Sequence, residues 1–260
     1  MTKKKYSGET EIKHKIEELF SYRKLIGLLQ QGGLAKDKIF YAHLVDIQYQ
    51  IYLLDAYLEG QWVLDKSALA SCWDKIKESL SKLNYSSSQI DKLLREIREY
   101  ERIERNCRKG KWPTSVSFRN FYTTKSCDVR LIRHLIYDAQ PELNRIWKEK
   151  DWAYYDLITE MNDDIEDIIE DLNTYNGNRF LISVLRKGSL KTEKQYRAYM
   201  DKITVKAKAY FKKHAEEGEN HQLLSWTMDR SRETLDLLDR TIHTNDPSLF
   251  SKSLLLAKMK

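Results

Sequence analysis

The sequence predicts an all-α fold, a single-domain helical bundle over residues 1–260. The chain has nine Gly and three Pro, so helices can run long and a turn-rich β fold is disfavoured. Hydrophobic residues make up 41% of the chain, which is enough for a sizeable core. Apolar residues recur at helical spacing, and no segment keeps the alternation of a half-buried strand.

Stop and cap residues bound the expected helices of the first half. The pair Gly32-Gly33 ends the first helix, and Gly60 ends the second. Ser67 can cap the third, and the loop at residues 108–113 follows the fourth. These four helices are expected at about residues 9–31, 36–59, 67–83 and 89–106.

The second half is expected to contain six helices. Pro141 suits the first turn of a long helix, which stops at Asn176-Gly177. The breaks between helices are too short to separate domains, so about ten helices form one bundle. The six helices are expected at about residues 124–139, 141–175, 178–186, 192–217, 219–243 and 247–258.

Charge patterning bears on the partners of the chain. The net charge of +6 comes from 45 basic and 39 acidic residues, which are interleaved along the expected helix faces. A nucleic-acid-binding protein clusters its cations, so we expect no nucleic-acid partner. The balance of charge suits a small anionic ligand at least as well as a polymer.

The sequence also bears on membrane insertion, on cellular location and on the state of the cysteines. No run of about 18 apolar residues occurs, so we expect no stable membrane insertion. A polar stretch follows the basic N-terminus where a signal peptide would have an apolar core, so a soluble, cytoplasmic protein is expected. Cys72, Cys107 and Cys127 match no disulfide or zinc pattern and are expected to be buried or half-buried thiols.

The segment at residues 161–173 is the most informative part of the chain. It holds six carboxylates, and like charges one turn apart destabilise a helix unless a cation neutralises them. Oxygen ligands at this spacing suit Mg²⁺. A solvated acidic helix with its isoleucines inward is the alternative. Two ladders are open: Asn162, Glu166 and Glu170, or Asp163, Asp167 and Asp171.

The segment resembles the second metal-binding motif of class I terpene synthases, Asn-Asp-x-x-Ser-x-x-x-Glu. In this register Asn162, Glu166 and Glu170 take the three ligand positions, with Glu in place of Ser at position 166, and Asp163 joins them as a metal candidate. Asn162 borders the apolar face of the expected helix, whereas Asp163 points nearly opposite the centre of that face, so we favour the Asn162 ladder. The resemblance implies an isoprenoid-synthase-like bundle.

The same family carries an aspartate-rich first motif about a hundred residues upstream. Asp55 and Glu59, one turn apart before Gly60, stand at that place. Their spacing is similar to the Asp-x-x-x-Asp form of squalene and phytoene synthases, and differs from the usual Asp-Asp-x-x-Asp. The resemblance implies that both carboxylates are catalytic metal ligands.

The resemblance also implies the rest of the site. Mg²⁺ is the expected cofactor and a prenyl diphosphate the substrate. The diphosphate would be bound by Lys125 and Arg130 near a helix start, by Arg179 after the acidic segment, and by Arg230. The implied function is a terpene synthase that ionises the substrate to an allylic cation, which is then cyclised or deprotonated.

Three alternatives remain open. The first is a prenyltransferase, of the trans-prenyl or the squalene and phytoene type. The second is a non-catalytic helical binding protein. The third is an RNA-binding module that uses the basic residues 105–111. A homodimer is the assembly considered.

Overall fold

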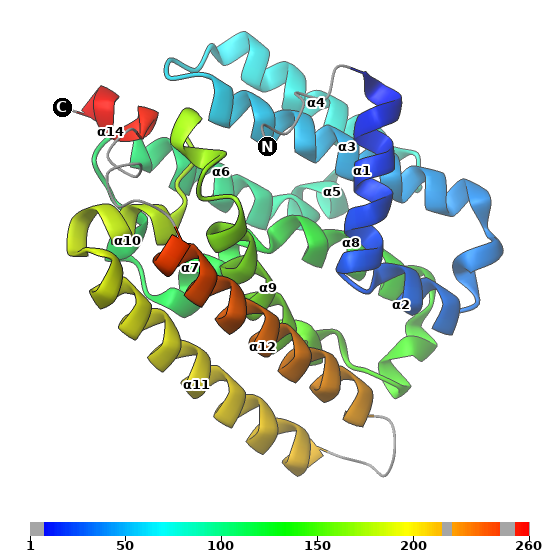
Figure 1. The fold of residues 1–260 in the computed structure, drawn as a ribbon. Helices are drawn as coiled ribbons and strands as arrows, with labels where there is room; N and C mark the ends of the chain where they lie inside the picture. The colour runs from blue at the N-terminus through cyan, green and yellow to red at the C-terminus, as the bar shows by residue number, and fades with distance from the viewer. Residues whose placement is uncertain (1–7, 215–219, 245–252, 260) are drawn as a thin grey trace. The chain divides into compact units, whose positions relative to one another are not determined.

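A computed structural model describes residues 8–214, 220–244 and 253–259, and every regular element in these ranges is a helix (Figure 1). The all-α prediction is therefore confirmed. No helix in the described ranges is long and apolar enough to cross a bilayer.

The chain forms two compact units, each assembled from discontinuous segments. Unit 1 comprises residues 1–57, 63–95 and 128–145, and unit 2 comprises residues 58–62, 96–127 and 146–260. The prediction of a single domain stays a prediction. Short 3-10 helices are labelled η. The elements of unit 1 are α1 (Glu9–Tyr22), α2 (Leu25–Gln31), η1 (Leu34–Lys36), most of α3 (Lys38–Gly60), α4 (Lys66–Ser81), α5 (Ser87–Leu93), all but the first residue of α8 (Cys127–Ala139), and η3 (Pro141–Arg145).

Polar bonds from α3 reinforce the apolar packing of unit 1. The inward stripe of α3 is buried, with Leu44 and Ile47 at its centre. Gln48 donates a hydrogen bond of 2.8 Å to Asp128 at the start of α8. Asp46 accepts one of 2.7 Å from Ser79 on α4. The central helix of unit 1 is thus tied to two neighbours through side chains beside its apolar stripe.

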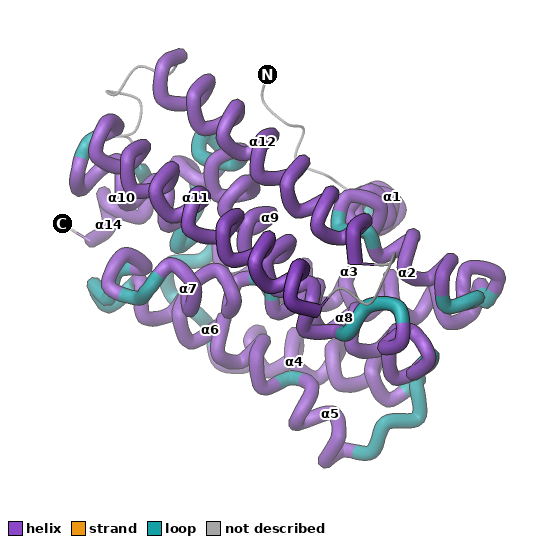
Figure 2. The backbone as a smooth tube through the Cα atoms, turned by 90° about the horizontal axis from the view of Figure 1, so that it is seen from below, coloured by secondary structure: helices purple, strands orange, loops and turns teal. Residues whose placement is uncertain are grey.

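Unit 2 is built around α9 (Ala153–Glu166). Ten of its 14 residues are buried, so its polar side chains must find partners inside the protein. The long helices α11 (Ser189–His214) and α12 (Asn220–Thr244) pack side by side and antiparallel, and α12 packs along α9 (Figure 1, Figure 2). The remaining elements are α6 (Arg95–Cys107), η2 (Pro113–Ser115), α7 (Phe118–Lys125), η4 (Glu149–Trp152), η5 (Asp171–Asn173), α10 (Arg179–Lys187) and α14 (Leu254–Met259).

Two helices expected in the first half are each divided in two. Residues 9–31 break between α1 and α2, where Lys24 adopts a left-handed conformation with φ of 63°. Residues 89–106 break at Leu94, between α5 and α6. Neither break contains Gly or Pro, and apolar residues keep their helical spacing across both. The sequence therefore predicted neither break.

The expectations for residues 124–175 need the largest correction. An additional helix, α7, ends at Lys125, and α8 begins only at Cys127. Lys125 therefore does not lie at a helix start. The single helix expected at 141–175 is wrong, because this stretch forms η3, η4, α9 and η5. Helix α9 ends at Glu166, in the middle of the acidic segment.

The four helices expected from residue 178 onward agree more closely with the structure. Helices α10, α11 and α12 confirm those at 178–186, 192–217 and 219–243 within a few residues, except that residues 215–217 and 219 lie outside the described ranges. Of the helix expected at 247–258, residues 247–252 lie outside the described ranges, and α14 covers the rest. The cysteine prediction is also confirmed: Cys107 and Cys127 are buried thiols and Cys72 is half-buried.

Candidate functional site

The acidic segment separates into a buried and an exposed set of carboxylates. Asp164 and Asp171 are buried, with 0% and 5% exposure. Glu166 and Glu170, the predicted ligands, are exposed. The predicted ladder needs a continuous helix, and α9 ends at Glu166, so that geometric premise is wrong.

Asp164 lies at the centre of the buried set and accepts bonds at both oxygens. Its Oδ1 accepts a hydrogen bond from the ammonium of Lys125, the last residue of α7, and forms a salt bridge with it. Its Oδ2 accepts hydrogen bonds from the hydroxyl of Tyr122 at 2.9 Å and from the backbone N–H of Arg179 at 3.0 Å. One carboxylate thus joins α7, α9 and the start of α10.

Asp171 is held by two asparagines that follow it. Asn178 Nδ2 donates to Asp171 Oδ2 at 2.7 Å, and Asn176 Nδ2 donates to Oδ1 at 3.1 Å. Asn178 also donates to the backbone oxygen of Asp164 at 2.7 Å, and its side-chain oxygen caps α10 at Leu181 N–H. The segment after α9 is therefore folded back onto the end of α9.

Lys125, Glu160, Asp164 and Asp171 form what we call the Lys125 cluster. Burial disfavours the charge of Lys125, but Asp164, Asp171 and Glu160 outweigh it and raise the pKa of this ammonium well above its usual value. Burial raises the pKa of Asp171 to about 7, and Asp167 and Asp164 add to the rise. The cluster therefore brings the charges of several buried acids to bear on one ammonium.

Aromatic side chains border the Lys125 cluster. The hydroxyls of Tyr122 and Tyr196 lie 2.6 Å apart, and both rings are buried. Burial, with the charge of Asp164 beside them, raises the pKa of both phenols well above the usual value. Phe118 and Phe180 pack against Tyr196 with ring centroids 5.1 and 5.0 Å away. The acids thus border a closely packed aromatic layer.

Asn162 and Asp163 lie apart from this arrangement. Asn162 is buried and donates a hydrogen bond of 3.1 Å to Thr234 on α12. Asp163 is half-buried. In the alternative ladder only Asp171 is buried, while Asp163 and Asp167 are half-buried. The buried acids therefore follow neither predicted ladder.

The first predicted pair, Asp55 and Glu59, lies in the last turns of α3, and both residues are half-buried. Asp55 belongs to unit 1 and Glu59 to unit 2. The backbone oxygen of Glu59 accepts a hydrogen bond of 2.8 Å from Tyr175 N–H. This bond joins the end of α3 to the segment that leads into α10. The metal-binding role of the pair stays a prediction.

The four cations predicted to bind diphosphate do not share one site in the structure: three lie in unit 2 and Arg130 lies in unit 1. Arg179 is buried; it donates to the backbone oxygen of Val116 at 2.7 Å and lies 4.3 Å from the centroid of Phe118. Arg230 is buried and pairs with Glu233 at 2.9 Å. Both cations therefore hold structure in unit 2. Lys125 belongs to the cluster, and Arg130 is half-buried on α8 in unit 1.

A second group of metal-ligand types lies between α11 and α12. Glu193, Asp239 and His243 offer ligand atoms within 4.8 Å of one another. The guanidinium of Arg197 pairs with Glu193 at 3.0 Å and also with Asp239. This group is already partly neutralised, and it ties the two helices together.

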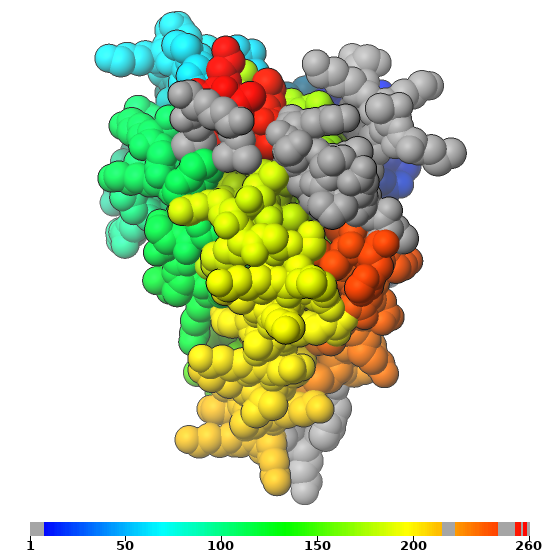
Figure 3. Space-filling view, turned by 60° about the vertical axis from the view of Figure 1, so that its left-hand side comes forward, coloured from blue at the N-terminus to red at the C-terminus, as the bar shows by residue number. Residues whose placement is uncertain are grey.

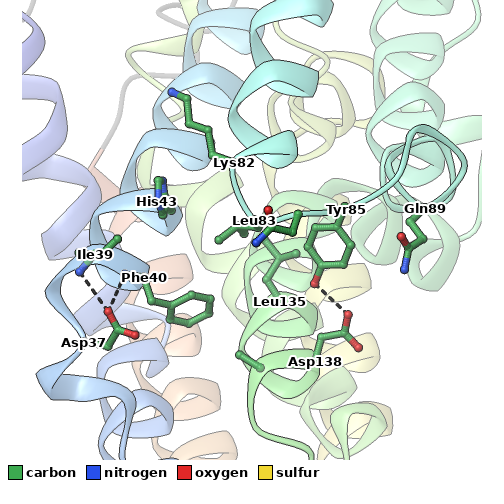
Figure 4. A pocket seen from close by; sticks show the side chains of 12 residues that line it. Asp37, Ile39, Phe40, His43, Lys82, Leu83, Tyr85, Gln89, Leu135 and Asp138 are labelled. Carbon is green, nitrogen blue, oxygen red and sulfur yellow. Dashed lines mark hydrogen bonds between the residues drawn. The ribbon is translucent and has the colours of Figure 1, made fainter.

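Unit 1 contains an open cavity of about 580 Å³ between α3, α5 and α8 (Figure 4). Phe40, Leu83 and Leu135 supply apolar surface. Tyr85 donates to Asp138 at 2.8 Å, and burial together with this carboxylate raises the pKa of Tyr85. The cavity could take a small molecule with an apolar body, and it contains none of the predicted site residues.

Several residues of the cluster and its border were not predicted as site residues, among them Glu160, Asp164, Tyr122, Tyr196 and Asn178. One signal is present for Asp164, which lies three residues after Met161 and directly before Ile165, at the edge of the apolar stripe. An acid at that position of an amphipathic helix is expected to be buried with a partner. Nothing in the local pattern pairs it with a lysine on another helix. No protein-family model matches the chain, and no curated protein or solved structure is significantly similar to it.

Proposed function

We propose that the chain is a Mg²⁺-dependent enzyme of the class I isoprenoid-synthase type that ionises a prenyl diphosphate, with a terpene synthase as the first assignment. The observation that carries the proposal is the Lys125 cluster, in which buried Asp164 pairs with the ammonium and the buried acids Asp171 and Glu160 also raise its pKa. Carboxylate oxygens gathered in this way are the donor type that a hard divalent cation prefers.

The donor set fits Mg²⁺ in kind. Glu160, Asp164 and Asp171 offer carboxylate oxygens, which this ion prefers, and a bound cation would favour the ionised form of Asp171, whose pKa burial raises to about 7. We therefore assign the metal-binding role to these three residues in place of Glu166 and Glu170. Bound Mg²⁺ would stabilise negative charge on a leaving diphosphate.

The chain's own residues have separate roles in this proposal. Lys125 is a permanent cation at the cluster and would contact the diphosphate. The aromatic layer of Phe118, Phe180 and Tyr196 would exclude water and face a developing carbocation with ring surfaces. Tyr122 and Asn178 position the carboxylates of Asp164 and Asp171.

The test is incubation with geranyl, farnesyl and geranylgeranyl diphosphate plus Mg²⁺, measuring diphosphate release and extractable hydrocarbon. Asp164→Asn and Asp171→Asn are expected to lower the rate by about 100-fold or more, as loss of a metal ligand does. Glu166→Gln and Glu170→Gln, exposed in the same segment, are the matched controls and should stay within about threefold.

Absence of diphosphate release from all three substrates, with and without isopentenyl diphosphate, would refute the proposal. A longer prenyl product that forms only with isopentenyl diphosphate would indicate the prenyltransferase alternative. The Mg²⁺-linked shift in Tm of the unmodified chain is a second measurement, which does not depend on the folding of the Asp variants. A ligand at 100 times its Kd should add about 2.7 kcal/mol to the free energy of unfolding.

A non-catalytic binding protein is the second candidate, and the cavity in unit 1 favours it. Its volume of about 580 Å³ is that of a small-molecule pocket, for which about 300–1,000 Å³ is usual. Under this assignment Mg²⁺ and diphosphate leave the Tm unchanged. A ligand found by thermal-shift screening should lose its effect in Ala139→Trp, which fills the cavity from an exposed position.

A further inference from the structure

The outer face of α11 is strongly basic. Seven lysines of this helix are exposed, against one exposed acid, Asp201. The helix has 26 residues and is therefore about 39 Å long. Figure 3 shows its outer face, in yellow, uncovered. The exposed lysines are thus spread along one long, accessible helix surface.

The arrangement follows from the two faces of the helix. Tyr196, Met200, Ile203, Ala207 and Phe211 recur at helical spacing and are buried. The lysines occupy the remaining positions and face solvent. Just before α11, burial and the neighbouring charges of Arg179, Lys191 and Arg186 lower the pKa of Lys187. Cations are therefore close enough on this surface to repel one another.

The excess of positive charge belongs to α11 and is not shared by the neighbouring α12. On α12, exposed Glu233 and Asp236 alternate with exposed Arg232 and Arg240. Glu193 and Asp239, two acids that lie close together between the described parts of α11 and α12, are neutralised by Arg197. The lysines of α11 are therefore left to attract an external anionic partner.

Apolar side chains stand among these lysines. Leu190 and Val205 are 69% and 66% exposed. The tyrosines of α11 that could stack on nucleobases already pack on other rings: Tyr199 stacks on Phe118 at 4.6 Å, and Tyr210 stacks on His214 at 4.3 Å. Lysines with exposed aliphatic side chains, and with the neighbouring rings already engaged, fit a lipid surface better than single-stranded nucleic acid.

We infer that the outer face of α11 docks on an anionic lipid bilayer, with its lysines at the headgroups and Val205 and Leu190 dipping into the interface. The helix lies along the membrane plane. Each lysine near an anionic leaflet strengthens binding, and the attraction falls within a Debye length. This inference is independent of any catalytic activity, because it uses none of the Lys125 cluster.

The test is co-sedimentation of the full chain with phosphatidylcholine vesicles, with or without about 30% phosphatidylserine. We expect binding only to the anionic vesicles, at about 0.05 M salt and not at about 0.5 M. Changing Lys191, Lys194, Lys202 and Lys206 together to Gln should weaken binding by about tenfold or more, since Gln keeps the helix propensity. Val205→Ser should weaken it further, by about threefold.

The matched control changes four exposed cations outside α11, Lys66, Lys75, Lys92 and Lys109, to Gln. It lowers the net charge by the same amount and should leave vesicle binding within about twofold. Equal loss in both variants, or no binding to anionic vesicles at low salt, would overturn the inference. Tighter binding to a mixed-sequence RNA, unaffected by Val205→Ser, would overturn it in favour of nucleic acid.

Discussion

At the scale of single residues, the pairing of Lys125 with Asp164 dominates the interior of unit 2. The side chain of Asp164 is fully buried, and that of Lys125 is only 17% exposed. Replacing one partner of a buried pair leaves the other charge uncompensated, which is strongly destabilising. The pair should therefore matter to the stability of the fold even if the protein has no catalytic activity.

Lys125→Met tests this role. It is expected to lower the free energy of unfolding by about 3–5 kcal/mol, because Asp164 stays buried without its cation. Urea unfolding followed by circular dichroism measures the loss. Lys92→Met, at an exposed position of α5, is the control and should change stability by less than about 0.5 kcal/mol. A similar small change in both variants would contradict the assignment of a buried pair.

Asp171 should make stability depend on pH. Its pKa of about 7 lies above the value of about 3.9 in an unfolded chain. Between these values the folded state holds more protons than the unfolded state. The free energy of unfolding therefore falls as pH rises from about 4 to 7, by at most about 1.4 kcal/mol per pH unit from this group.

Asp171→Asn removes the titrating group. The difference in free energy of unfolding, wild type minus variant, should decrease steadily between about pH 4 and 7 in urea titrations. Asp201→Asn, at an exposed acid of α11, should leave the pH profile unchanged. Parallel profiles for the wild type and Asp171→Asn would show that Asp171 is ionised throughout this range in the fold.

At the scale of elements, the turn between η5 and α10 depends on a residue without a side chain. A Cβ at Gly177 would lie 2.8 Å from Glu104 Oε1 and 3.0 Å from Cys107 Sγ, both on α6. The Gly177 N–H donates to both oxygens of Glu104, at 3.3 and 3.2 Å. Close backbone approach and this hydrogen bond together place the start of α10 against α6.

Gly177→Ala should therefore lower the free energy of unfolding by about 1–3 kcal/mol, because packed neighbours on α6 must move. Thermal melting is a sufficient measurement. Gly60→Ala is the matched control: Gly60 ends α3, and no described atom lies within 4 Å of the place that a Cβ would take there. A loss in Gly177→Ala no larger than in the control would show that α6 yields easily at this point.

The sequence could predict the helices but not several of their ends. Helices that stop at Gly or Pro, such as the one before Gly60, are found near the expected residues. The breaks at Lys24, Leu94, Ser126 and Asp167 contain neither residue. They are set by tertiary packing, which a local apolar period does not record.

The candidate site shows the same limit. The acidic segment and Lys125 were both singled out by the sequence, as was Arg179. Their partners were not, because Asp164 and Lys125 are 39 positions apart and lie on different helices. The end of α9 at Glu166 then decides which acids turn inward. Composition and spacing therefore locate the segment, and packing selects its residues.

At the scale of the whole molecule, the two units are interleaved along the chain. Residues 96–127 belong to unit 2 although residues 63–95 and 128–145 belong to unit 1. Within that insertion, Phe121 and Tyr122 are buried against the core of unit 2. Synthesis up to residue 145 thus completes unit 1 while leaving part of unit 2 without its core.

A chain truncated after Arg145 should therefore fold poorly. It is expected to bind a hydrophobic dye and to melt without a cooperative transition, because Phe121 and Tyr122 lose their cover. Calorimetry and dye fluorescence, with the full chain as reference, make the comparison. A sharp transition in the truncated chain would show that unit 1 is stable by itself.

The net charge of the chain differs from the local charge on the surface of α11. A net charge of +6 with interleaved signs predicted no extended basic surface. Burial of one face of α11 leaves its lysines together on the other face, and Arg197 takes up two of the acids nearby. The overall balance of charge therefore says little about the surface potential at one helix.

The cysteines have a practical consequence. Burial, with Glu104 beside it, raises the pKa of Cys107, so this thiol does not ionise at neutral pH. Cys107 and Cys127 are both buried. A thiol reagent should reach them only when unit 2 opens, whereas half-buried Cys72, in unit 1, should react without such an opening. The chain thus carries its own reporters for timing the opening of unit 2, without any added label.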